Sequence, residues 1–334
     1  MRRQSAIIHD SNETAVSRLS RARVLLAFVA LFLLGFSVGL NADEKRKTII
    51  FILSGDAPVY TEVATATEEF VSAGCNRKSI DCDNLVFKQI TANEAPPETI
   101  QHSFLTISLG TRAAEWLDSQ SYDGNQINAM LPFPGKNKTE PPQHSAHARI
   151  FIDQPYKRYF NLIRATIPRA ARVGLLIHES DADKISIIVD NAKEHGLTIR
   201  TGIVRYERDV GEALSHILND IDVLLALPDS RIHNSHTISH ILTTAYRNNI
   251  PLVGFSSAYV KAGAASAVYT SPEDIARQVA DTVLEFLQTG RIKRSVQQAT
   301  YFSISINFEV ARSLGLPPSS PSDVKQEVST GIFE

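Results

Sequence analysis

Cysteine is scarce in this chain of 334 residues, which contains only Cys75 and Cys82. A zinc site built on cysteine lacks ligands here, because no C-x2-C spacing and no nearby histidine accompanies the pair. In an oxidising compartment we expect the two residues to form a structural disulfide. The loop between them is short, so the disulfide is expected to stabilise the fold by about 2–3 kcal/mol.

An excess of basic charge is also missing. The chain has 34 Lys and Arg against 36 Asp and Glu, and omitting Met1–Ala42 leaves 29 against 34, a formal net charge of −5. No Lys- or Arg-rich stripe with interleaved aromatic residues follows residue 48. Binders of nucleic acid carry such a basic surface, so we expect no nucleic-acid partner.

Motifs of catalysis and phosphate binding are absent: there is no G-x-S-x-G, no G-x-x-x-x-G-K-[ST], and no G-x-G-x-x-G after a strand. We therefore predict no enzyme and no cofactor, although a triad assembled in three dimensions stays open as the least favoured class. His236 and His240 share a helix face at a zinc-ligand spacing, but the sequence between them lacks the Glu of H-E-x-x-H. A solvated helix face is the preferred interpretation, with no metal site.

Only one long apolar run is present, at residues 24–40, after Arg18, Arg21 and Arg23. It is slightly longer than the apolar region of a usual signal peptide, about 7–15 residues, and close to the shortest membrane span, about 17. Residues 1–42 are thus predicted to be a secretory signal or an uncleaved N-terminal anchor. No cysteine follows the run for lipid attachment, and we expect a periplasmic protein.

From residue 48 onward, apolar strand-like runs alternate with helical patterns, which is typical of parallel sheets with crossover helices. The first helix is expected to end at Gly74. We predict an α/β fold of two Rossmann-like lobes. Lobe 1 would comprise residues 46–154 plus about 258–298, lobe 2 residues 155–257 plus about 299–316, and the Pro- and Ser-rich residues 317–334 would be a flexible tail.

Several stretches of the second half, in this order, resemble substrate-binding proteins of ABC transporters, in the uncharacterised group near the tryptophan/tyrosine-type proteins. They are Arg172–Ile177, Ala192–Leu197, Ile221–Asp229, Asn249–Phe255, Val260–Ala264 and Ile306–Leu316. The resemblance implies a type I periplasmic-binding fold with a multi-strand hinge. It also implies a small-molecule ligand, with amino acid-like molecules as one candidate class, and a membrane permease as partner.

In this family the loops after the strands contact the ligand. Gly110-Thr111 resembles its Gly-Thr turn, Asp229-Ser230 its Asp turn, and Ser256-Ser257 a turn near the hinge. The turns at residues 54–56 and 178–181 depart from the family pattern, which leaves the ligand's identity open. The predicted ligand-binding residues are Ser54, Asp56, Tyr60, Gly110, Thr111, Glu179, Ser180, Asp229, Ser230, Ser256 and Ser257.

Each of these positions also has a purely structural interpretation. Thr111 could hold an anion or simply cap a helix, and Asp229 could accept from a ligand or form a turn. Ser256 could face the cleft or end a strand, and Tyr60 could stack on a ligand or on the core. For the whole chain we predict hinge closure around a ligand that is delivered to an ABC permease. The alternative is an exported sensor or interaction module without a transport role.

Overall fold

The computed structural model describes residues 46–133, 146–317 and 320–333. The expected signal or anchor at residues 1–42 lies outside this part of the chain. So does most of the segment 135–147, whose polar residues and prolines predict a surface loop. Within the three described ranges, none of the helices combines the length and the apolar character that a membrane crossing requires.

The first sheet has six parallel strands in the order β11-β5-β4-β3-β1-β2. Its central strands are continuous apolar runs, and both of their faces are covered, so β1 and β3 bury almost every residue. The strands are β1 (Lys47–Leu53), β2 (Leu85–Thr91), β3 (Leu105–Leu109), β4 (Gln126–Leu131), β5 (His147–Phe151) and β11 (Val296–Gln297); the helices beside them are α2 (Pro58–Lys78), α3 (Glu98–Gln101), α4 (Thr111–Ser119) and α10 (Pro272–Thr289).

The second sheet repeats this plan in the order β12-β10-β9-β8-β6-β7, with only β12 antiparallel. Its strands are β6 (Arg172–His178), β7 (Thr198–Val204), β8 (Val223–Leu225), β9 (Leu252–Gly254), β10 (Ser266–Tyr269) and β12 (Ser303–Ile306). Its helices are α5 (Tyr156–Thr166), α6 (Lys184–Glu194), α7 (Val210–Leu218), α8 (Ile238–Arg247), α9 (Ser257–Lys261), α11 (Phe308–Ser313) and α12 (Pro321–Thr330), with 3-10 turns η1 (Glu179–Asp181) and η2 (Glu207–Asp209). The predicted α/β class with two parallel-dominated sheets is confirmed.

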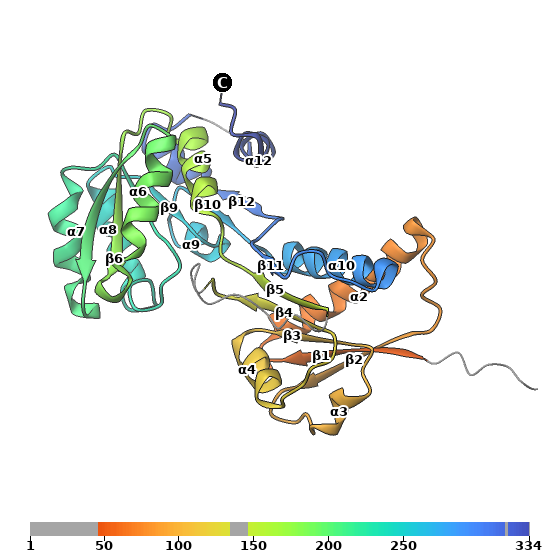
Figure 1. Ribbon diagram of the computed structural model, residues 1–334. Helices are drawn as coiled ribbons and strands as arrows, with labels where there is room; N and C mark the ends of the chain where they lie inside the picture. The colour runs from red at the N-terminus through yellow and green to blue at the C-terminus, as the bar shows by residue number, and fades with distance from the viewer. Residues whose placement is uncertain (1–45, 134–145, 318–319, 334) are drawn as a thin grey trace, which may run out of the picture. The chain divides into compact units, whose positions relative to one another are not determined.

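The chain passes between the two sheets three times, at residues 152–155, 270–271 and 298–302, called the hinge segments below. After the second passage α10 returns to the first lobe, where it lies along α2 and buries Ile275, Val279 and Val283 in the core of the first sheet (Figure 1). Residues 258–269 were expected in lobe 1. They instead form part of α9 and all of β10, which pairs with β9 and β12 in the second sheet.

The first helix does not end at Gly74 as expected, because α2 continues to Lys78. Gly74 is buried where α2 meets α10, and a Cβ atom at this position would lie 2.2 Å from Leu284 Cδ1. The glycine therefore serves close helix packing rather than chain termination. The last turn of α2 carries Cys75, which forms the predicted disulfide with Cys82.

The C-terminal residues are also more ordered than expected. Instead of a loose tail, residues 321–330 form α12, which Ser320 caps by accepting the N–H of Asp323. Val324 and Val328 lie four residues apart on one face and are buried in the core of the second sheet. Proline and serine here mark a helix start rather than disorder, because Pro321 occupies the first turn.

Candidate functional site

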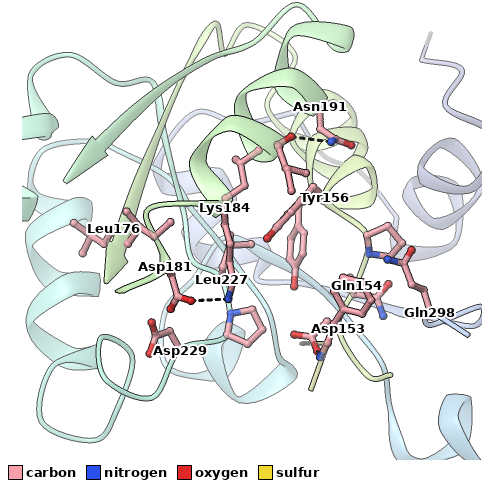
Figure 2. A pocket seen from close by; sticks show the side chains of 17 residues that line it. Asp153, Gln154, Tyr156, Leu176, Asp181, Lys184, Asn191, Leu227, Asp229 and Gln298 are labelled. Atoms are coloured by element: carbon pink, nitrogen blue, oxygen red, sulfur yellow. Dashed lines mark hydrogen bonds and ion pairs between the residues drawn. The ribbon is translucent and has the colours of Figure 1, made fainter. Parts of the chain in front are cut away.

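A pocket of about 330 Å³ opens at the carboxyl ends of the strands of the second sheet (Figure 2). β6 ends there with Leu176 and Ile177, and the turn after β8 adds Leu227, Pro228 and Asp229. The strand order of the second sheet reverses direction between β6 and β8. In open α/β sheets this switch point is the usual place for a ligand, because the loops on either side diverge there.

The hinge segments close another side of the same pocket. Asp153, Gln154 and Pro155 follow β5, Gln298 follows β11, and Tyr156 begins α5. α6 contributes Lys184, Ile187, Ile188 and Asn191. The pocket therefore combines an apolar wall with a small set of polar groups, the composition expected of a small-molecule site.

Two of the carboxylates at the pocket are held by basic side chains. Asp181 pairs with Lys184 Nζ at 2.8 Å and also with Arg231. Arg231 binds Asp229 through both carboxylate oxygens, each at 2.8 Å. Burial alone would raise the pKa of Asp181, but the hydrogen bonds from Lys184 and Arg231 outweigh it and lower the pKa. The same contacts, chiefly with Asp229, raise the pKa of Arg231. The loops after β6 and β8 are thus tied together by one guanidinium group.

The third carboxylate, Asp153, has a different environment. Its Oδ2 accepts the N–H of Phe133 at 2.6 Å, and burial raises its pKa despite that bond. Tyr156 lies nearby, and its pKa is raised to about 12, first by burial and then by the charges of Asp153, Asp181 and Asp183. The tyrosine hydroxyl therefore remains a neutral donor in a negative environment.

Three predicted residues of the first lobe, Ser54, Tyr60 and Gly110, meet at the carboxyl ends of β1 and β3. Ser54 Oγ accepts the N–H of Ala113 at 2.9 Å, so this buried hydroxyl caps α4 from a neighbouring strand. Gly110 has φ +91°, and a Cβ atom there would lie 2.6 Å from Ser54 Oγ and 2.9 Å from Tyr60 Cε1. The N-cap of α4 is Gly110, so the capping interpretation of Thr111 is wrong; Thr111 is the first helical residue and is exposed, as is Asp56.

Of the predicted residues in the second lobe, Asp229 lines the pocket, and Ser180 is linked to it through Arg231 Nη1 at 2.7 Å. Glu179 forms a separate ion pair with Arg205 at 2.9 Å. Ser256 caps α9 by accepting the N–H of Tyr259, with Ser257 next in the chain, and the carbonyl of Ser230 accepts from Asn234. Five of the predicted residues of the second lobe are not among those that line the pocket: Glu179, Ser180, Ser230, Ser256 and Ser257.

Asp153, Gln154, Tyr156 and Lys184 are pocket residues that the sequence analysis missed. Asp153 follows a strand just as Asp229 does, but from the sequence it stands at the expected end of lobe 1 and carries no family motif that marks it as a ligand-binding turn. His236, weighed as a metal ligand, pairs with Glu207 at 3.2 Å. In the part of the chain that the structure describes, no three His, Cys, Asp or Glu side chains gather closely enough to hold a metal ion.

Solved structures share this fold at low sequence identity. A domain from Streptococcus pneumonia in complex with L-Trp is 16% identical with a TM-score of 0.55, covering 85% of this chain and 98% of its own. A substrate binding protein with adhesive properties from Clostridium difficile, in a ligand-free, open structure, is 17% identical with a TM-score of 0.64. The match covers 82% of this chain and 96% of that protein. A periplasmic ribose ABC transporter protein from Conexibacter woesei is 13% identical with a TM-score of 0.54. The match covers 84% of this chain and 97% of that protein. No curated protein matches the chain.

Two sheets with one shared strand order and three connecting segments define a type I periplasmic-binding fold. Within that class, the chain belongs to the family of ABC transporter substrate binding proteins, whose profile matches residues 153–320, half of its length. The resemblance inferred from the sequence is thereby confirmed. Proteins of this family bind a small molecule for an ABC transporter, are typically extracytoplasmic, and are generally not enzymes.

Proposed function

We propose that this protein captures a small molecule in the pocket beside the hinge segments and delivers it to the membrane permease of an ABC transporter. The observation that carries the proposal is the position of the pocket. It lies at the switch point of the second sheet and is lined in part by the hinge segments, so a bound molecule contacts the residues about which two lobes would rotate.

The first lobe would complete the site when the lobes close. Its strand-end residues Ser54, Gly110 and Thr111 occupy the same place in the first sheet that Asp229 occupies in the second, at the carboxyl ends beside the strand-order switch. We infer that these turns, with Asp56 and Tyr60, face the ligand across an interlobe cleft. Ligand contacts made with both lobes favour the closed form, which the permease recognises.

Export is the other part of the proposal. Residues 1–42 would direct the chain out of the cytoplasm, and the Cys75–Cys82 disulfide suits an oxidising compartment. The L-Trp bound by the Streptococcus protein supports amino acid-like molecules as the first candidates.

The test uses the purified chain from residue 43 onward and a broad metabolite panel that includes the amino acids. A true ligand at one hundred times its Kd should stabilise the fold by about 2.7 kcal/mol, seen as a higher melting temperature, and should reduce the radius of gyration in solution scattering. A panel that changes neither quantity would contradict the proposal. Uptake of the identified ligand in cells lacking the chain separates transport from sensing, because only transport requires the chain for uptake.

A further inference from the structure

We propose that the pocket selects a compact organic cation with a protonated amine, and that Asp153 is the residue that receives this amine. This inference rests on the proposed function, since it names the ligand class of the same pocket. It is carried by the distribution of charges around the pocket and by the apolar walls beside them.

Among the described residues, the pocket lining contains three carboxylates, Asp153, Asp181 and Asp229, and one cation, Lys184. Arg231 is not among these lining residues but pairs with Asp229. In Figure 2, Asp181, Lys184 and Asp229 lie to the left and Asp153 to the right. Lys184 pairs with Asp181, and Arg231 pairs with both Asp181 and Asp229, so each of these charges is already paired.

Asp153 is the lining carboxylate that forms no ion pair within the described part of the chain. Its hydrogen-bond donors there are backbone N–H groups, that of Phe133 and its own, and Lys184 acts on it only as a weaker charge that is already paired with Asp181. An ionised carboxylate can accept about four hydrogen bonds, so Asp153 has acceptor capacity left. A buried charge of this kind is stabilised by an opposite charge. The neighbouring Tyr156 hydroxyl, whose pKa is raised by burial and by the surrounding carboxylates, reports the same negative environment.

An anionic ligand group would meet the opposite situation. Of the lining residues that the structure describes, Lys184 provides the basic atom, and its Nζ is held by Asp181 at 2.8 Å. A carboxylate entering the pocket would have to displace Asp181 or lie against three acidic side chains. Like charges at such distances are mutually destabilising, which makes an amine the favoured group.

The walls indicate that the cation is organic. Leu176, Ile177, Ile188, Leu227 and Pro228 form an apolar surface that gains free energy only when it covers hydrocarbon. The polar groups of the hinge, by contrast, stand at one side. A molecule with an amine at one end and an apolar body matches both parts.

The test compares molecules of one shape and opposite charge. Tryptamine is paired with indole-3-propionate, phenethylamine with 3-phenylpropionate, and pentylamine with pentanoate, and binding is measured by calorimetry. We expect at least one amine to bind, with its carboxylate partner about tenfold weaker or more, because a charge-assisted hydrogen bond is gained by one and lost by the other. Asp153→Asn should weaken the amine about tenfold or more and leave the carboxylate unchanged or slightly better.

Two further variants keep the outcome decisive. Asp153→Glu retains the charge and should retain the preference for amines. Asp190→Asn removes an equal charge from the exposed side of α6, where Asp190 pairs with Lys193, and should change nothing.

Carboxylates or neutral molecules that bind as tightly as amines, or amine binding that Asp153→Asn leaves unchanged, would overturn this inference and leave the proposed function standing. Failure of both these pairs and the whole metabolite panel would instead overturn the proposed function, and this inference with it.

Discussion

Gln154 Nε2 donates a hydrogen bond to Thr270 Oγ1 at 2.6 Å, and this bond joins the first hinge segment to the second. Thr270 Oγ1 in turn donates to the carbonyl of Ile152 at 2.8 Å. Arg158 donates to Gln154 Oε1 and, through the same Nη1, to the carbonyl of Ala299 at 2.9 Å in the third segment. One side chain that lines the pocket therefore holds all three connections together.

Replacing Gln154 by alanine should destabilise the protein by about 1–3 kcal/mol, because its partly buried partners Thr270 and Arg158 lose their hydrogen bonds to it. Gln154 is only 5% exposed, so water cannot easily replace the lost contacts. Urea unfolding monitored by circular dichroism gives this free energy.

Gln326→Ala is the matched control, since Gln326 is exposed on α12, and its effect should remain within about 0.5 kcal/mol. Thr270→Val keeps the shape of the threonine but removes its hydroxyl. The double variant with Gln154→Ala should lose less free energy of unfolding than the sum of the two single losses, because both changes remove the same hydrogen bond. Additive effects would show that the two residues do not act as a unit.

Gly74→Ala should destabilise the protein although alanine is the better helix former. The usual gain of about 0.5–1 kcal/mol is opposed by overpacking, about 1–3 kcal/mol, because the new Cβ would lie 2.2 Å from Leu284 Cδ1. Leu284 is only 2% exposed and cannot swing away into solvent. The free energy of unfolding in urea measures the net effect.

Gly211→Ala provides the comparison within α7, where a Cβ would meet the end of the His240 side chain at 3.1 Å. It should be neutral or stabilising. In the background Leu284→Ala, which vacates the contact, Gly74→Ala should lose most of its penalty. An unchanged penalty in that background would exclude Leu284 as its cause.

The strands of both sheets could be predicted from the sequence because they are apolar runs ended by polar turns. Strand β11 could not be predicted, because a strand of two residues, Val296 and Gln297, is too short to show a hydrophobic periodicity. The role of Gly74 in helix packing depends on α10, which lies more than two hundred residues away in the chain. The local sequence therefore indicated only a helix end, which glycine usually marks.

The candidate site was harder to predict for a related reason. Asp229 could be found because it directly follows a strand in a turn that resembles the family. Asp153 and Gln154 have the same local signal, but their importance comes from lying where three hinge segments converge, which only the paired strands reveal. Ser54 is the opposite case. Its position after a strand suggested a ligand contact, but its hydroxyl accepts a hydrogen bond from the backbone of α4.

Removing the disulfide by the double change Cys75→Ala and Cys82→Ala should lower the free energy of unfolding by about 2–3 kcal/mol, through the loss of a short closed loop from the unfolded chain. Wild-type protein in a reducing agent should have a free energy of unfolding similar to that of the double variant. The free energy of unfolding of the variant itself should not change when the reductant is added. Two free thiols in protein purified from an oxidising compartment would contradict the pairing.

Asp222 gives the fold a defined dependence on pH. The Arg172 side chain and the N–H groups of Ala171 and Arg172 bind its carboxylate, with Arg172 Nη2 at 2.7 Å, and together they lower its pKa to about 2 against burial. Because the folded pKa lies below the unfolded value of about 3.9, the charged form stabilises the native state. This contribution is complete above the unfolded pKa and is lost as the pH falls toward the folded one.

Asp222→Asn should therefore be less stable than wild type at pH 6, and the difference should shrink between about pH 4.5 and 2.5. The pair is partly exposed, so solvent screening limits the effect to about 1 kcal/mol. Urea unfolding at several pH values measures the difference between the two proteins. Asp190→Asn, which alters an exposed pair on α6, should show no such convergence, and a difference for Asp222→Asn that stays constant down to pH 2.5 would exclude a lowered pKa as its source.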